Sequence, residues 1–99
     1  MKINLMIFIS SVIEQEKSIS MMKTFESDIR PVKGDIMDDP GFHNGYEVVK
    51  VSINYASNEC FVSLHPFAIE IEEIKMETYI EKLEAHSWHV VSKEELKSM

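Results

Sequence analysis

Cysteine, glycine and proline, which many small folds depend on, are scarce in this chain of 99 residues: there is one cysteine, and there are three glycines and three prolines. A single cysteine excludes an internal disulfide and also a zinc finger or zinc ribbon, which needs two to four thiolates at short spacing. In its alternating segment, Cys60 reads as a small buried hydrophobe rather than as a nucleophile. The glycines at 34, 41 and 45 fit neither a P-loop nor a dinucleotide-binding loop.

Catalytic signatures are also missing. No serine lies in a G-x-S-x-G turn, and no two histidines have the H-x-x-x-H spacing of a helical metal site. His65, His86 and His89 could still meet in space, which leaves a metal site or a general base open. Asp35, Asp38 and Asp39 offer oxygen ligands for a cation, but aspartates beside Pro-Gly are also ordinary turn formers. The sequence therefore favours a binding protein over an enzyme, with no metal and no cofactor.

Positive charge is the next deficit. Ten basic residues face 17 acidic ones, for a formal net charge of −7, and most of the excess lies in residues 51–99. Such a chain repels phosphate backbones, so we expect no direct contact with nucleic acid. The same charge is also a common means of keeping a small domain soluble.

No hydrophobic run is long enough to span a bilayer, which takes about 20 apolar residues. The N-terminal run could instead belong to a signal peptide, but Glu14, Gln15 and Glu16 follow it at once and no small-x-small cleavage site is present. We therefore expect a cytoplasmic protein without a membrane segment. The length fits a single domain over residues 1–99.

Alternating apolar and polar residues predict most of the chain to be strand. In the first run Ile3, Leu5, Ile7 and Ile9 share one face. In residues 47–55 we expect Val49 and Val51 to point inward, and the break at 56–59 predicts a hairpin to the next strand. The expected strands cover residues 2–9, 19–27, 36–37, 47–55, 60–64, 67–71 and 88–91.

The period changes to that of a helix over residues 73–86, where Met76, Tyr79, Ile80 and Leu83 form an apolar stripe. Ser87 then takes the place where a C-terminal glycine is usual. These patterns predict an α+β fold: a mainly antiparallel sheet of about five or six strands, open or curled into a half-barrel, covered by one C-terminal amphipathic helix.

The opposite side of this helix is acidic. Its glutamates fall within about 80° of one another at 3.6 residues per turn, and Lys75 and Lys82 lie on the other flank. A solvated helix face explains such a row, and so does a binding surface for a basic protein partner. The expected partner-binding residues are Glu70, Glu72, Glu73, Glu77, Glu81 and Glu84.

The segments 31–36, 46–51 and 60–64 resemble a pattern of small β-barrels, in which a Gly-Asp turn leads into one strand and a Tyr-x-Val-x-x-Val strand returns beside it. The short length, acidic charge and many Met and Ile residues also resemble the small accessory proteins that bacteriophages and prophages encode. This resemblance implies a protein that binds and blocks a host protein, in one form by imitating DNA.

Two functional hypotheses follow. The first is a non-enzymatic module that binds a basic protein surface, with a homodimer through the edge strand at 19–27 as a further option. The alternative is a small-ligand or nucleotide binder, or an enzyme, with a pocket between sheet and helix. The residues expected to line that pocket are Tyr46, Tyr55, His65 and Trp88.

Overall fold

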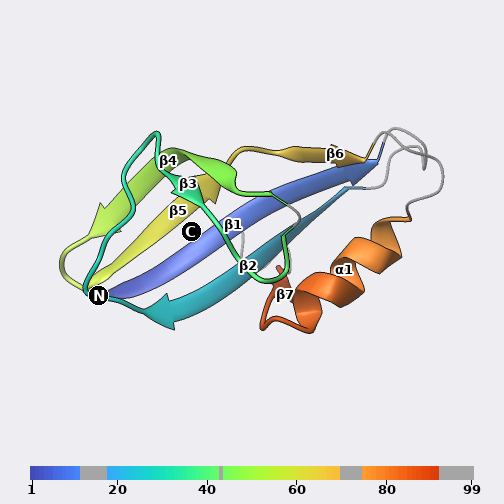
Figure 1. Ribbon diagram of the computed structural model, residues 1–99. Helices are drawn as coiled ribbons and strands as arrows, with labels where there is room; N and C mark the ends of the chain where they lie inside the picture. Colours follow the sequence, from blue (N-terminus) through green and yellow to red (C-terminus); the bar gives the residue numbers. More distant parts are fainter. Residues whose placement is uncertain (12–17, 43, 70–74, 92–99) are drawn as a thin grey trace.

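A computed structural model describes residues 1–11, 18–42, 44–69 and 75–91. It is a sheet-dominated α+β fold, in which the sheet is curled into a half-barrel and one short helix lies at its end (Figure 1). In this part of the chain the elements are β1 (Lys2–Ser11), β2 (Ser18–Glu26), β3 (Ile36–Met37), β4 (Tyr46–Asn54), β5 (Glu59–Leu64), β6 (Phe67–Ile69), α1 (Met76–Glu84) and β7 (His89–Val90).

Two hairpins form the sheet. β1 pairs antiparallel with β2, and β4 pairs antiparallel with β5, as the turn at 56–59 predicts. The hairpins meet through a parallel pairing of β1 with β5, and β6 continues beyond β5 as a second parallel neighbour of β1. The order is β3-β4-β5-β1-β2-β7, and with β6 beside β1 the described sheet has seven strands of mixed direction, whereas about five or six strands in a mainly antiparallel sheet were expected.

The strand β1 is central to both the sheet and the core. Its alternating residues Ile3, Leu5, Ile7 and Ile9 are all buried, as expected. They meet the inward side chains of β5, which are Cys60, Val62 and Leu64. Because both neighbours of β1 add apolar residues to the same face, this alternation places one continuous core on one side of the sheet.

The expected faces of β4 are wrong at its start. Val48 is fully buried, whereas Val49 is 36% exposed. The pairing with β5 shifts between Val48 and Lys50, so one extra residue is inserted there as a β-bulge. The bulge reverses the alternation, which brings Val48 into the core and leaves Val51 and Ile53 half-buried after it.

The helix α1 is shorter than expected, and residues 70–74 lie outside the described part. Its stripe is confirmed: Met76 and Leu83 are buried. However, α1 packs mainly against β1 and β7 (Figure 1) and does not cover the sheet as a whole. A nine-residue helix is about 14 Å long, whereas the ten residues of β1 extend over about 33 Å.

The end of α1 explains why Ser87 stands where glycine is usual. The Trp88 N–H donates to Leu83 O (3.1 Å) and the Ser87 N–H to Glu84 O (3.3 Å), which is the Schellman pattern. Ser87 has a φ of 73°, in the left-handed region that this pattern requires. The turn brings Trp88 into the core beside Leu83.

The outer face of the sheet, away from the core, is held by a polar network. Asn4 is buried there; its Nδ2 donates to Glu59 Oε1 (3.0 Å) and to Cys60 O (3.1 Å), and its Oδ1 accepts from Thr24 Oγ1 (2.7 Å).

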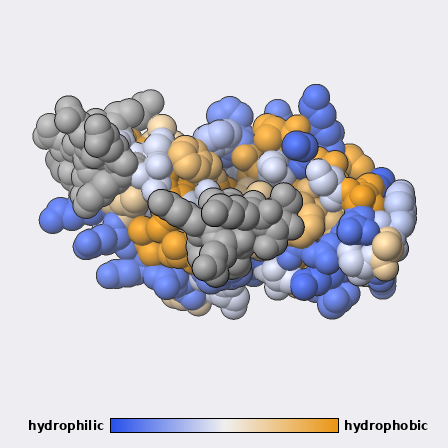
Figure 2. Space-filling model, turned by 180° about the vertical axis from the view of Figure 1, so that it is seen from behind, coloured by the Kyte–Doolittle hydropathy of each residue, from blue (hydrophilic) through white to orange (hydrophobic). Residues whose placement is uncertain are grey.

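On the side of the molecule turned away in Figure 1, hydrophobic surface lies in separate patches between hydrophilic ones (Figure 2). Among the described residues, no helix is long and apolar enough to cross a membrane.

Candidate functional site

The acidic side of α1 is the first candidate. Glu77, Glu81 and Glu84 are exposed, while Met76 and Leu83 bury the other side of the helix. At 100° and 1.5 Å per residue, the three carboxylates leave the helix within about 60° of one another, about 4.5–6 Å apart along its axis. Glu70, Glu72 and Glu73 lie outside the described residues. We call Glu77, Glu81 and Glu84 the acidic side of α1.

These three charges are not compensated within the described part of the chain. The ion pairs found there join Met1 to Glu26 and Lys23 to Asp39 and involve none of the three. Glu77 and Glu81, one turn apart, repel each other by about 0.2–0.5 kcal/mol. Glu84 lies in the last turn, where the helix dipole disfavours a negative charge. The fold therefore gains nothing visible from Glu81 or Glu84.

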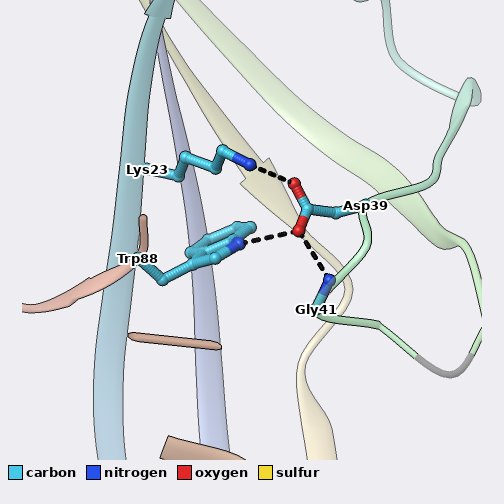
Figure 3. Close-up of polar contacts among 4 residues, drawn as sticks. All are labelled: Lys23, Asp39, Gly41 and Trp88. Atoms are coloured by element: carbon cyan, nitrogen blue, oxygen red, sulfur yellow. Dashed lines mark hydrogen bonds and ion pairs between the residues drawn. The ribbon is translucent and has the colours of Figure 1, made fainter. Parts of the chain in front are cut away.

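A second polar cluster joins the loop after β3 to the body of the domain (Figure 3). The carboxylate of Asp39 receives Lys23 Nζ on Oδ2 (2.7 Å), and Oδ1 accepts from Trp88 Nε1 (3.1 Å) and from the Gly41 backbone N–H (2.9 Å). We call these four residues the Asp39 junction. It links β2, the loop and the end of α1 through one carboxylate.

The charge on Asp39 is kept by these donors. Burial alone would raise the pKa of Asp39, since its side chain is only 7% exposed. The hydrogen bonds from Lys23, Gly41 and Trp88 outweigh burial, and the pKa lies below its ordinary value. Both carboxylate oxygens of Asp39 already accept hydrogen bonds from donors of the protein itself. The Asp39 junction therefore stabilises the fold by holding the loop after β3 against β2 and Trp88.

An aromatic cluster fills the space between sheet and helix. Phe42 packs edge-on against Tyr46 (ring centroids 4.7 Å apart) and, tilted, against Trp88 (5.3 Å). Phe67 joins Tyr46 (5.8 Å) to Tyr79 of α1 (4.9 Å). Burial, with a smaller contribution from Tyr79, raises the pKa of the Tyr46 phenol. The structure thus brings Tyr46 and Trp88 together around Phe42, but as packed side chains.

Tyr55 and His65 lie elsewhere. Tyr55 is 80% exposed in the β4–β5 turn, and about 30 Å of strand separates it from Tyr46 at the other end of β4. His65 is exposed at the end of β5, where its Nδ1 lies 2.9 Å from Pro66 O. The four residues expected to line one pocket therefore do not converge.

Two hollows of the described structure bear on a ligand site, and both are small. Between sheet and helix, beside Phe42 and Tyr46, about 10 Å³ remains, which is room for one water molecule. A hollow of about 200 Å³ lies instead on the outer face of the sheet, lined by Met6, Lys50, Ser52, Phe61 and Ser63. Ligand pockets usually measure about 300–1,000 Å³.

The remaining polar candidates have local roles. Asp35 Oδ2 accepts from the Val32 backbone N–H (3.0 Å), which is turn chemistry. Among the described residues, no three His, Cys, Asp or Glu side chains are placed to hold a metal ion. His43 lies outside those residues.

Sequence reasoning missed the Asp39 junction. One signal was available: Lys23 interrupts an apolar face of β2, and a lysine there needs a carboxylate partner. The sequence offered no means of choosing Asp39 over Asp38, or of adding Trp88. In comparisons with protein-family models, with curated proteins and with solved structures, no match to this chain was found.

Proposed function

We propose that this chain is a protein-binding module that presents the acidic side of α1 to a basic surface of another protein. The observation that carries the proposal is the row of Glu77, Glu81 and Glu84, exposed and without an ion pair among the described residues. These carboxylates are free to meet lysine and arginine side chains. Their spacing of about 4.5–6 Å along one rigid helix suits a partner with regularly spaced cations.

The proposal extends to inhibition. A basic surface that normally receives a nucleic acid backbone would be occupied by carboxylates instead, which blocks its natural ligand. The net charge of −7 adds long-range attraction to such a partner and repulsion from nucleic acid itself.

The acidic side of α1 is a better candidate for a binding site than the two hollows are. The space between sheet and helix is filled by the aromatic cluster and leaves about 10 Å³. The outer hollow, at about 200 Å³, is below the usual size of a ligand site. Neither gives a small-ligand binder the enclosure that affinity for a small molecule requires.

Affinity capture from a cell lysate, followed by mass spectrometry, tests the proposal with the full chain as bait. The variant Glu77→Lys/Glu81→Lys should lose the captured partner, because two of the three carboxylates become repulsive. The matched control is Asp28→Lys/Glu47→Lys, which changes the net charge by the same amount at two positions away from α1.

Capture should also weaken steeply as salt is raised from about 50 to 500 mM, since screening acts most strongly on exposed charges. Equal loss of the partner in both charge-reversal variants would point to net charge alone. Capture unchanged by Glu77→Lys/Glu81→Lys would overturn the proposal. Both variants should unfold at nearly the same temperature as the unmodified chain.

A further inference from the structure

The strand β4 has an open edge over most of its length. β3 pairs only with Tyr46 and Glu47, and the backbone of Gly34 and Asp35 bonds to Val48. From Val49 to Asn54, no described strand pairs with the side of β4 that faces away from β5. At the other edge of the sheet, β7 pairs with the middle of β2 and interrupts the edge there. The longer uninterrupted open edge is therefore that of β4.

Exposed apolar side chains lie on this strand and beside its start. Of the seven large hydrophobic residues that are exposed in the described part of the chain, Val49 belongs to β4, Tyr55 to the turn after it, and Ile36 to β3, which pairs with the start of β4. An edge with unpaired backbone groups and apolar neighbours is the usual template for a further strand.

We propose that β4 pairs antiparallel with β4 of a second copy of this chain, with the two-fold axis at Ser52. The bulge at Val49 leaves a regular stretch from Lys50 to Asn54, and Ser52 is its midpoint. Two copies of one strand pair antiparallel about a two-fold axis, and an axis at this midpoint uses the whole regular stretch. The register is set by the part of β4 that can form an unbroken ladder.

The side chains are self-complementary in this register. Val51 faces Ile53 of the second copy, on the half-buried side of the strand, and Lys50 faces Asn54. No two like charges stand opposite each other, whereas a register centred on Lys50 would oppose two ammonium groups. A second copy thus pairs with the unpaired backbone groups of β4 without bringing like charges together.

The expected dimer is weak. A five-residue ladder and the apolar side chains beside it bury less than the roughly 1,000 Å² of a stable interface, so a Kd on the order of 10–100 μM is expected. Sedimentation of the unmodified chain, from about 5 to 500 μM, should show the mass rising from monomer to dimer. A monomer at every concentration would overturn the proposal.

The register is tested by Ser52→Cys. Residues opposite each other in an antiparallel pair have Cα atoms about 4.5–5.5 Å apart, which lies within the range that a disulfide spans. The two thiols introduced at position 52 should therefore join under mild oxidation at concentrations where the dimer forms. The native Cys60 is fully buried, and burial raises the pKa of its thiol, so it does not compete.

The matched control is Ser57→Cys, which places an exposed thiol in the turn after β4. It lies beyond the end of β4, so two such thiols would sit at opposite ends of the paired stretch, out of the reach of a disulfide. Covalent dimer should form at least about tenfold faster with Ser52→Cys than with Ser57→Cys. Equal rates would overturn the register, provided that circular dichroism shows both variants folded.

Discussion

The Asp39 junction gives the sharpest test of what holds this fold together. In Asp39→Asn the side chain keeps an oxygen that can accept from Trp88 and Gly41, but it loses the charge that pairs with Lys23. A charge-assisted hydrogen bond contributes about 1.5–3 kcal/mol. Water reaches Lys23, which is 21% exposed, so the loss should lie near the middle of that range, at about 2 kcal/mol. Asp39→Ala also leaves the Trp88 N–H without its acceptor and should cost about 3–4 kcal/mol.

Urea titration followed by the fluorescence of Trp88, the one tryptophan, measures these losses directly. A double-mutant cycle with Lys23→Met separates the pair from its surroundings, and its coupling free energy should be at least about 1 kcal/mol. A coupling near zero would mean that the 2.7 Å contact between Lys23 and Asp39 contributes nothing to stability.

The pH dependence of the same difference has a definite sign. The pKa of Asp39 lies below its ordinary value of 3.8 in the folded chain, so its contribution is complete above that pH and is lost as the pH falls through the folded pKa. The free-energy gap between the unmodified chain and Asp39→Asn should be constant from about pH 7 to about 5 and shrink below about pH 4. A gap that persists unchanged to about pH 2 would refute the reasoning.

Two further substitutions test the backbone. Ser87→Gly should raise the free energy of unfolding by about 0.5–1 kcal/mol, because glycine adopts the φ of 73° without strain. The control Ser57→Gly, at an exposed position without a positive φ, should give no gain in stability. A loss of stability in Ser87→Gly would contradict the Schellman assignment. Val48→Ala should lower the free energy of unfolding by about 2 kcal/mol and Val49→Ala by less than about 0.5 kcal/mol, because the bulge buries only Val48. Urea titration measures both losses. The reverse order would place the bulge elsewhere.

The features that sequence reasoning predicted well are local. The alternation of Ile3, Leu5, Ile7 and Ile9 sets the face of β1, and the stripe through Met76 and Leu83 sets the inward side of α1, because each pattern is complete within a few residues. The position of Ser87 was equally readable, since a helix end is a local event.

What escaped prediction depends on residues far apart in the chain. The parallel pairing of β1 with β5 joins two hairpins whose sequences say nothing about their relative direction. The Asp39 junction joins Lys23, Asp39 and Trp88, of which the last two are 49 positions apart. The bulge at Val49 is decided by the register against β5 and not by any residue in β4 that resists strand geometry. In each case a one-dimensional pattern is compatible with several arrangements, and packing chooses among them.

The polar residues of the described part of the chain fall into two groups: those whose removal should lower the stability of the fold and those whose removal should not. Among the described residues, no buried side-chain nitrogen or oxygen lacks a hydrogen-bond partner, and Asn4 and Asp39 supply the most connected examples. Removing either should lower stability. By contrast, Glu81 and Glu84 have no ion pair in this part of the chain, and α1 tolerates them at a small cost. A residue that slightly lowers the stability of the fold and makes no contact that compensates for this loss is easier to explain if it serves an interaction outside the chain. We therefore expect the acidic side of α1 to bind a partner, and the Asp39 junction to stabilise the fold.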